Sequence, residues 1–447
     1  MNLQRKTWLA CCVMTLAVVC AGFVSAQNLP PNLTLLPACP DNPRNLLYSS
    51  PADNACMPEQ QGHFTVIHDF SGSDGANPSG VAVDAFGNLY GPVQPLGANG
   101  AVYKMSPFGS NWVMSNLYNF PGAGNGSLPA GVIVGRNGIV YGAASAGDQN
   151  CSGQSCGMIF ALRPSPRICH SIPCDWMENT LYDFTGTTDA WQGTGLVQDR
   201  AGNLYGVSYH GGAQQHGAIF QLSPSVGGWL ETILYSFTGS SDGAGPTSVV
   251  IGNDGNLYGT AATAGINGGG VVFQLTPSGS GWSESVLHAF GLDLWGEPAN
   301  AHSLVQDSAG NLFGEYSMGL FPEGGPEIIG VIFMLTPSNG SWLYSELRQN
   351  DYPVGTDVFN NLAIDSAGNL FGTGGGTIGC IWPLPEHGYI FQLARSNNGW
   401  QYSTPVYWDN TYFHVSGSVA LDAHGNLYGT TADCGYNNQG TVWRLTP

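Results

Sequence analysis

Four aromatic and two acidic residues lie in segments that differ from one part of this repetitive sequence to the next. They are Trp191, Trp295, Trp382 and Tyr412, with Glu297 and Asp351. Aromatic side chains present large, flat apolar faces on which sugar rings can stack, and carboxylates accept hydrogen bonds from sugar hydroxyls. The combination predicts a carbohydrate-binding site. The alternative is that these rings pack beneath their own loops, where apolar residues commonly form small satellite clusters.

Aspartates recur in a different setting, ahead of Gly-Asn turns. They are Asp84, Asp199, Asp307, Asp365 and Asp422. A carboxylate at this place can accept backbone N–H groups of its own turn, so we interpret these residues as structural. The calcium-loop pattern Asp-x-Asp-x-Asp-Gly does not occur in the sequence. We therefore predict no metal site and no cofactor.

The elements that must position these side chains are the strands of a tandem repeat. Its core string, Gly-Asn-Leu-Tyr/Phe-Gly, recurs at 87–91, 202–206, 255–259, 310–314, 368–372 and 425–429, with a degenerate copy at 138–142. An alternating apolar run precedes each copy, a second apolar run follows it, and a strand opened by tryptophan usually comes last. Four short strands in a repeat of about 50 residues are typical of a propeller blade. The sequence predicts an all-β, seven-bladed β-propeller of four-stranded antiparallel blades.

Ring closure can be read from the two ends of the repeat region. The seventh copy stops after its third strand, at residues 441–445, and residues 64–70 form an unmatched fourth-strand pattern ahead of the first copy. A stack of blades leaves an exposed sheet edge unless the ring closes. We therefore expect the N-terminal strand to complete the last blade.

The predicted topology places two kinds of loop on one face of the ring: those before each first strand and those between the second and third strands. These loops hold the aromatic and acidic residues named above. Counting eight residues back from each turn glycine gives the positions expected at the mouth of the central channel, which are Ser79, Ala130, Thr194, Thr247, His302, Asn360 and Gly417. His302 is the one titratable residue in that set. An enzyme would need paired carboxylates or a histidine–metal group there.

Several strings recur in a fixed order and resemble the GloVer tandem repeat over residues 63–447. They are Asp-x-Ala-Gly-Asn-Leu-Tyr/Phe-Gly, Gly-Val-Val-Phe-Gln-Leu-Thr-Pro, Gly-Trp-x-Glu and Leu-Tyr-Ser-Phe. The GloVer repeat occurs in exported bacterial proteins called choice-of-anchor repeat proteins. The resemblance implies a β-propeller and export, and it implies no particular activity. NHL-type repeats share part of the pattern but are usually shorter, so they rank second.

The N-terminus has the features of a secretory signal peptide. Arg5 and Lys6 precede an apolar stretch that ends at Val24-Ser25-Ala26, so we expect residues 1–26 to be removed. A Pro/Asn-rich extension, 27–62, then precedes the propeller at 63–447. The chain carries a net charge of −19, and losing Arg5 and Lys6 makes it more negative. This excludes nucleic acid as a natural partner. We expect a secreted monomer without a transmembrane segment.

The cysteines fit an exported protein. Three of the 11 lie in the signal peptide, which leaves eight. An even number in an oxidising compartment predicts disulfides. The spacing favours the pairs Cys39–Cys56, Cys151–Cys156, Cys169–Cys174 and Cys380–Cys434. A zinc site is the less consistent alternative, because no Cys-x2-Cys spacing occurs.

These features favour an extracellular module that binds a glycan or another surface protein. No Gly-x-Ser-x-Gly, His-Glu-x-x-His or phosphate-loop motif is present. A polysaccharide lyase or glycoside hydrolase with its site on the variable loops is the alternative. Under either hypothesis, the ligand-binding candidates are Trp191, Trp295, Glu297, His302, Asp351, Trp382 and Tyr412.

Overall fold

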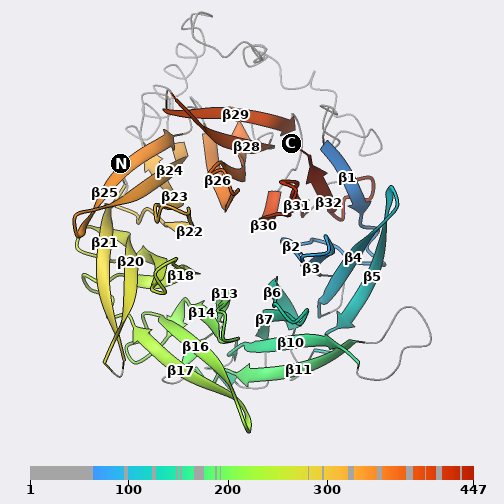
Figure 1. The fold of residues 1–447 in the computed structure, drawn as a ribbon, viewed down its shortest axis with the longest axis horizontal. Helices are drawn as coiled ribbons and strands as arrows, with labels where there is room; N and C mark the ends of the chain where they lie inside the picture. The colour runs from blue at the N-terminus through green and yellow to red at the C-terminus, as the bar shows by residue number, and fades with distance from the viewer. Residues whose placement is uncertain are drawn as a thin grey trace, which may run out of the picture.

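The computed structural model describes residues 64–446 apart from the gaps 95–98, 123–126, 147–149, 152–153, 166–175, 187–188, 192, 280, 294–295, 321–326, 350–354, 379–385, 398, 409–414 and 433–434. Seven four-stranded antiparallel sheets form the blades of a ring around a central channel (Figure 1). This confirms the predicted seven-bladed propeller. Within the described ranges, no helix is long and apolar enough to cross a membrane.

Each blade runs from a first strand beside the channel to a fourth strand at the rim. The strands of blades 1 to 4 are, in that order, β2 (Ala82–Val83), β3 (Leu89–Val93), β4 (Ala101–Phe108) and β5 (Asn111–Asn119); β6 (Ser127–Val134), β7 (Val140–Ala146), β10 (Met158–Pro164) and β11 (Trp176–Asp183); β13 (Thr194–Gln198), β14 (Leu204–Ser208), β16 (Ala218–Ser225) and β17 (Gly228–Ser236); and β18 (Ala244–Ile251), β19 (Leu257–Thr263), β20 (Gly268–Ser278) and β21 (Gly281–Gly291).

The remaining blades follow the same order. Blades 5 to 7 comprise β22 (His302–Gln306), β23 (Leu312–Leu320), β24 (Glu327–Ser338) and β25 (Ser341–Gln349); β26 (Gly355–Ile364), β27 (Leu370–Ile378), β28 (Glu386–Ser396) and β29 (Gly399–Trp408); and β30 (Val415–Leu421), β31 (Leu427–Thr431), β32 (Thr441–Leu445) and β1 (Phe64–Asp69). Two small ribbons, β8 (Asn150–Cys151) with β9 (Gln154–Ser155) and β12 (Ala190–Trp191) with β15 (His210–Gly211), lie in loops.

The N-terminal strand closes the ring, as predicted. β1 pairs antiparallel with β32, from Phe64 opposite Leu445 to Asp69 opposite Thr441. The pairing continues beyond the strand, because Phe70 donates its backbone N–H to the carbonyl oxygen of Gly440 at 3.0 Å. The last blade is thus built from both ends of the repeat region.

The Asp-x-x-Gly-Asn turns are held by their aspartates. Asp84 Oδ1 accepts the backbone N–H groups of Phe86 and Asn88, and its Oδ2 accepts the Asn88 amide and the Tyr90 hydroxyl. Gly87 adopts φ = 78°, a left-handed conformation that suits glycine. Asp199 and Asp422 hold their turns in the same way. The structural interpretation of these carboxylates is confirmed.

The last glycine of each core string makes room for a buried ring. Gly206 lies opposite Phe220 in the sheet, and the phenyl ring fills the space that a Cβ on Gly206 would need. The same pairing occurs in the other blades, at Gly91–Tyr103, Gly142–Phe160, Gly259–Phe273, Gly314–Phe333, Gly372–Phe391 and Gly429–Trp443. Each of these rings is fully buried.

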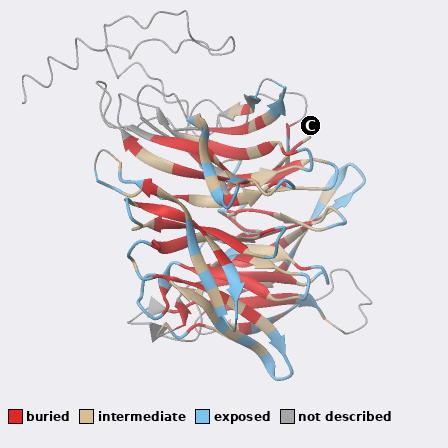
Figure 2. Ribbon diagram, turned by 60° about the vertical axis from the view of Figure 1, so that its left-hand side comes forward, coloured by how far each residue is buried: buried red, intermediate tan, exposed pale blue. Residues whose placement is uncertain are grey.

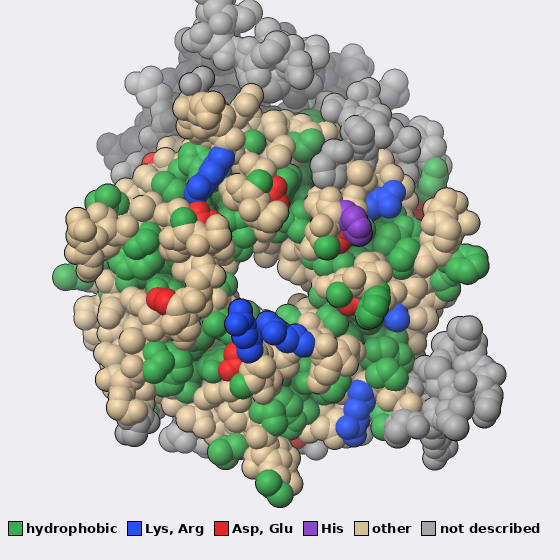
Figure 3. Space-filling model, in the orientation of Figure 1, with side chains coloured by type: hydrophobic (Ala, Val, Ile, Leu, Met, Phe, Trp, Pro, Cys, Tyr) green, Lys and Arg blue, Asp and Glu red, His purple; other side chains and the backbone are tan. Residues whose placement is uncertain are grey.

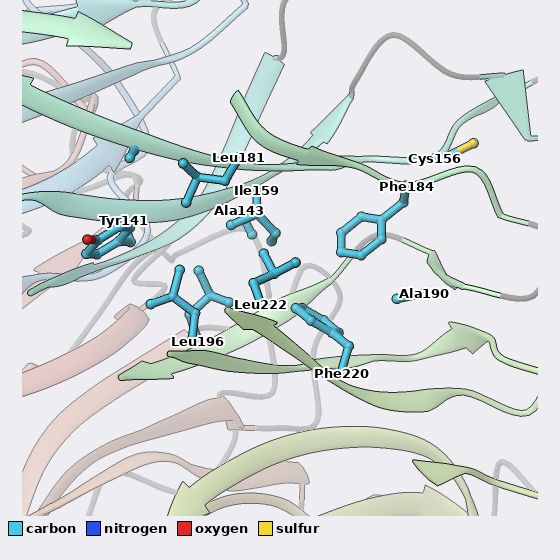
Figure 4. Close-up of a cluster of buried hydrophobic side chains, with 12 residues drawn as sticks. Tyr141, Ala143, Cys156, Ile159, Leu181, Phe184, Ala190, Leu196, Phe220 and Leu222 are labelled. Atoms are coloured by element: carbon cyan, nitrogen blue, oxygen red, sulfur yellow. The ribbon is translucent and has the colours of Figure 1, made fainter. Parts of the chain in front are cut away.

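Neighbouring blades adhere through two aromatic contacts. Directly after β11, Phe184 of blade 2 packs edge-on against Phe220 of blade 3, with 5.2 Å between the ring centres. Both rings belong to the apolar cluster of Figure 4. Towards the rim, Trp229 of blade 3 packs edge-on against Tyr141 of blade 2 at 6.0 Å. The repeated tryptophans therefore pack blades together, as predicted. Burial is concentrated in the inner strands, while exposed residues lie on turns and rim strands (Figure 2).

Candidate functional site

The two faces of the ring differ in what they carry. Turns between first and second strands and between third and fourth strands lie on one side, here called the turn face. The opposite side, the variable-loop face, carries the loops that enter each first strand and those between second and third strands. In blade 3 these two loops pair directly, since β12 lies antiparallel to β15 with Trp191 opposite His210. The predicted loop arrangement is therefore present.

Three of the predicted ligand-binding residues fall within the described ranges. Trp191 belongs to β12, and only its backbone is described. Glu297 is exposed in the loop before β22 and donates its backbone N–H to Asp293 Oδ1 at 2.8 Å. His302 begins β22. Trp295, Asp351, Trp382 and Tyr412 lie outside the described residues, so their roles stay predictions.

The channel mouth holds a carboxyl group that the sequence analysis missed. Glu315 of β23 lies opposite His302 in the sheet, is fully buried, and places Oε1 3.5 Å from His302 Nε2. The expectation that His302 was the one titratable group there was wrong. Only first-strand positions were counted, whereas Glu315 reaches the same place from a second strand.

Burial governs the protonation of Glu315. Burial raises the pKa of its carboxyl to about 7, against the lowering effects of the His302 charge and of the hydrogen bond from the Asn361 backbone N–H at 2.5 Å. The other carboxyl oxygen, Oε2, is buried without a hydrogen-bond partner among the described residues. Asn361 belongs to the first strand of blade 6, so Glu315 bridges two blades.

Both ring nitrogens of His302 are engaged. Nδ1 lies 2.8 Å from the Asn300 carbonyl oxygen, which can only accept a hydrogen bond, so Nδ1 carries the proton. Nε2 faces Glu315. With both nitrogens directed at protein atoms, His302 is poorly placed to exchange a proton with a ligand in the channel.

A pocket of about 180 Å³ lies between blades 2 and 3 at the variable-loop ends of their first strands. Two of the predicted mouth positions, Ala130 and Thr194, line it together with Ala144, Ser145, Gly193, Tyr209 and His210. The Tyr209 ring is 43% exposed and meets the His210 ring edge-on at 4.9 Å. This pocket combines aromatic rings with hydroxyl groups.

The fold holds Tyr209 in place from the next blade. Its ring lies over Gly245 in the first strand of blade 4, where a Cβ would collide with it. Gly245 has φ = 61°, so glycine suits this position on both counts. Trp191 is the cross-strand neighbour of His210. The backbone of Trp191 therefore lies at the edge of the pocket.

The cysteine pairs lie largely outside the described residues. Cys156 is buried in the cluster between blades 2 and 3 and is disulfide-bonded. The side chain of Cys151, and all of Cys39, Cys56, Cys169, Cys174, Cys380 and Cys434, lie outside the description. The pairing scheme stays a prediction.

Comparison with known proteins supports the repeat and the fold. Residues 157–341 match the model of the Gloeobacter/Verrucomicrobia repeat, in agreement with the resemblance seen in the sequence. A search of curated proteins finds no match. Among solved structures, the chain is similar to an ulvan lyase of a polysaccharide lyase family, at 12% identity and a TM-score of 0.52 over 83% of this chain and 94% of that one.

A luciferin-regenerating enzyme is also similar, at 13% identity and a TM-score of 0.41 over 86% of this chain and 95% of that one. At 12% identity, the likeness to the ulvan lyase shows the propeller fold alone.

Proposed function

We propose that this protein is an exported carbohydrate-binding propeller, which binds an extracellular glycan on its variable-loop face without chemically changing it. The observation that carries the proposal is the pocket lined by Thr194, Tyr209 and His210 beside Trp191. Its partly exposed tyrosine offers an apolar face for a sugar ring, and the hydroxyls of Thr194 and Ser145 can exchange hydrogen bonds with those of a sugar. The predicted signal peptide and the predicted disulfides support export.

The enzyme alternative rests on Glu315 and His302. A carboxyl group whose pKa is about 7 could act as a general acid near neutral pH. Its protein contacts favour a structural role instead, because Oε1 accepts the Asn361 N–H and His302 is bound through both nitrogens. We therefore favour binding over catalysis.

Glycan-array binding of the wild type and two variants tests the proposal. Tyr209→Ala should weaken binding by about 0.5–1.5 kcal/mol, or roughly twofold to tenfold, as expected for the loss of one aromatic contact. Trp191→Ala should have a similar effect. Tyr436→Ala is the matched control, since Tyr436 is 69% exposed in a loop of the same face on blade 7 and does not line the pocket. Equal binding by all variants with an intact circular dichroism spectrum would reject this pocket.

A further inference from the structure

One position of the repeat changes chemical type in a single blade. Six of the seven copies carry proline where the third strand ends: Pro107, Pro164, Pro224, Pro277, Pro337 and Pro447. The sixth copy carries Arg395 in its place. In blades 1 to 5 the proline lies opposite the fourth-strand tryptophan, as Pro337 does opposite Trp342. In blade 6, Arg395 lies opposite Trp400.

The Arg395 side chain reaches across to blade 5. Its Nη2 donates a hydrogen bond to Asp307 Oδ2 at 2.7 Å, and the guanidinium lies 5.1 Å from the Trp400 ring centre and 5.9 Å from that of Phe313. Asp307 is almost fully buried, whereas the Arg395 side chain is 42% exposed. The guanidinium has five N–H donors, and among the described residues one of them is hydrogen-bonded, to Asp307. Its remaining donors are open to a ligand.

The arginine is not needed to complete the turn of Asp307. In blades 1, 3 and 7 the equivalent aspartate also accepts a tyrosine hydroxyl, which Phe313 lacks. Asp307 is held by its own turn all the same, through the Ala309 and Asn311 backbone N–H groups and the Asn311 amide. Phe371 in blade 6 also lacks the hydroxyl. Asp365 is nevertheless held by its own turn, through Ala367, Asn369 and no arginine. The turn therefore does not require arginine in place of proline, and the exchange needs another explanation.

A pocket of about 330 Å³ lies at this exchange, between blades 5 and 6 on the turn face. Its lining includes Asn311, Met334, Thr336, Arg395, Ser396 and Trp400. It combines an aromatic ring, a guanidinium, an amide and two hydroxyls, and its volume falls in the range of small-molecule sites. Figure 3 shows this face, on which Lys and Arg side chains lie in several separate patches around the central channel.

We infer that this pocket is a second sugar-binding site, on the face opposite the variable loops, and that it takes a neutral hexose unit. Asp307 compensates the charge of Arg395, so the site does not require an anionic ligand. The planar guanidinium suits a pair of adjacent hydroxyls, while Trp400 supplies an apolar surface. A propeller with sites on both faces would bridge two glycan chains.

This inference is tested by titrating the protein with neutral hexasaccharides of glucose, mannose and galactose. Oligogalacturonate serves as the anionic comparison. Binding is followed by calorimetry and by the indole N–H signal of Trp400 in NMR spectra. Arg395→Pro restores the residue of the other copies and should keep the fold while weakening turn-face binding at least tenfold. Arg395→Lys keeps the charge but loses the planar donors, and it should weaken binding similarly.

Matched variants separate this site from the proposed variable-loop site. Trp400→Phe should weaken binding, and Trp342→Phe, at the proline-bearing position of blade 5, should leave it unchanged. Binding of a neutral oligosaccharide that survives Tyr209→Ala but is lost in both Arg395 variants supports the inference. Binding lost only in Tyr209→Ala supports the variable-loop site and overturns this one. Unchanged affinity in a folded Arg395→Pro protein, or binding of oligogalacturonate alone, also overturns it.

Discussion

Gly80 donates its backbone N–H to Thr430 Oγ1 at 3.0 Å, although 350 residues separate the two in the chain. The bond crosses the seam between blade 7 and blade 1. Glu315 has the same relationship to Asn361 between blades 5 and 6, since both acceptors directly follow the last glycine of a core string. At these two interfaces, a polar side chain of a second strand binds the backbone of the next first strand.

The closing strand should decide the stability of the whole ring. Deleting residues 27–70 removes β1 and leaves β32 as an unpaired edge, so we expect a large fall in melting temperature and aggregation. Deleting only residues 27–62 is the control, because it keeps β1. Differential scanning calorimetry should find the shorter deletion close to the wild type. Equal melting temperatures for the two deletions would contradict closure through β1.

Adding one methyl group at the core string should destabilise a blade. Gly206→Ala places a Cβ in the space filled by the Phe220 ring, and overpacking of this kind costs about 1–3 kcal/mol. Gly281→Ala is the matched control, since a Cβ there meets no atom within 4 Å. Urea unfolding measures both. A Gly206→Ala protein as stable as the control would show that the ring can move aside at little cost.

The buried carboxyl at the channel mouth should make stability depend on pH. Burial raises the pKa of Glu315 from 4.5 to about 7, so the folded state holds a proton that the unfolded state releases in this range. Its contribution is fully present below pH 4.5 and is lost as the pH rises to about 7. Glu315→Gln should therefore gain on the order of 2–3 kcal/mol over the wild type between pH 5 and pH 8.

Comparison of variants is needed because other groups titrate in the same range. Burial and a neighbouring aspartate raise the pKa values of Glu231 and Glu284 to about 7. Glu297→Gln, at an exposed side chain, is the control. The test compares the free energies of unfolding of the wild type, Glu315→Gln and Glu297→Gln at pH 5 and pH 8. A difference between Glu315→Gln and wild type that does not change with pH would contradict the assignment.

The predicted disulfide pairs can be identified by peptide mapping. Non-reducing peptide mapping of the protein, produced by export to an oxidising compartment, should recover the links 39–56, 151–156, 169–174 and 380–434. The last of these would join the same loop type of two adjacent blades. Eight free thiols, or a 156–169 link, would contradict the scheme.

Repetition explains what could be predicted from the sequence. Seven copies of one string, most of them with a turn aspartate and a fourth-strand tryptophan, determine strand order, blade number and the closing strand, because a single blade cannot bury both of its faces. Glu315 was missed because it differs from its neighbours at one repeat position. The other six copies carry an uncharged residue there, which is Thr260, Thr373 or Thr430 in three of them and Pro92, Ala143 or Val207 in the rest, and the acidic residue was the available signal. Arg395 among prolines is a second case of the same kind.

The binding pockets could not be predicted, because they depend on side chains from different blades. Tyr209 is an unremarkable loop residue in the sequence, and its position follows from the glycine at 245 in the next blade. Trp191 likewise lies beside His210 because two loops pair, and the spacing of these residues in the sequence does not reveal that pairing.

The most direct test of the proposed function incubates the protein with a polysaccharide to which it binds on a glycan array. Binding and the release of new chain ends are measured in the same sample. We predict saturable binding, weakened by Tyr209→Ala, with no release of chain ends over the unincubated control. Release that is abolished by Glu297→Gln, His302→Ala or Glu315→Gln would contradict a non-catalytic binding protein and establish the enzyme alternative.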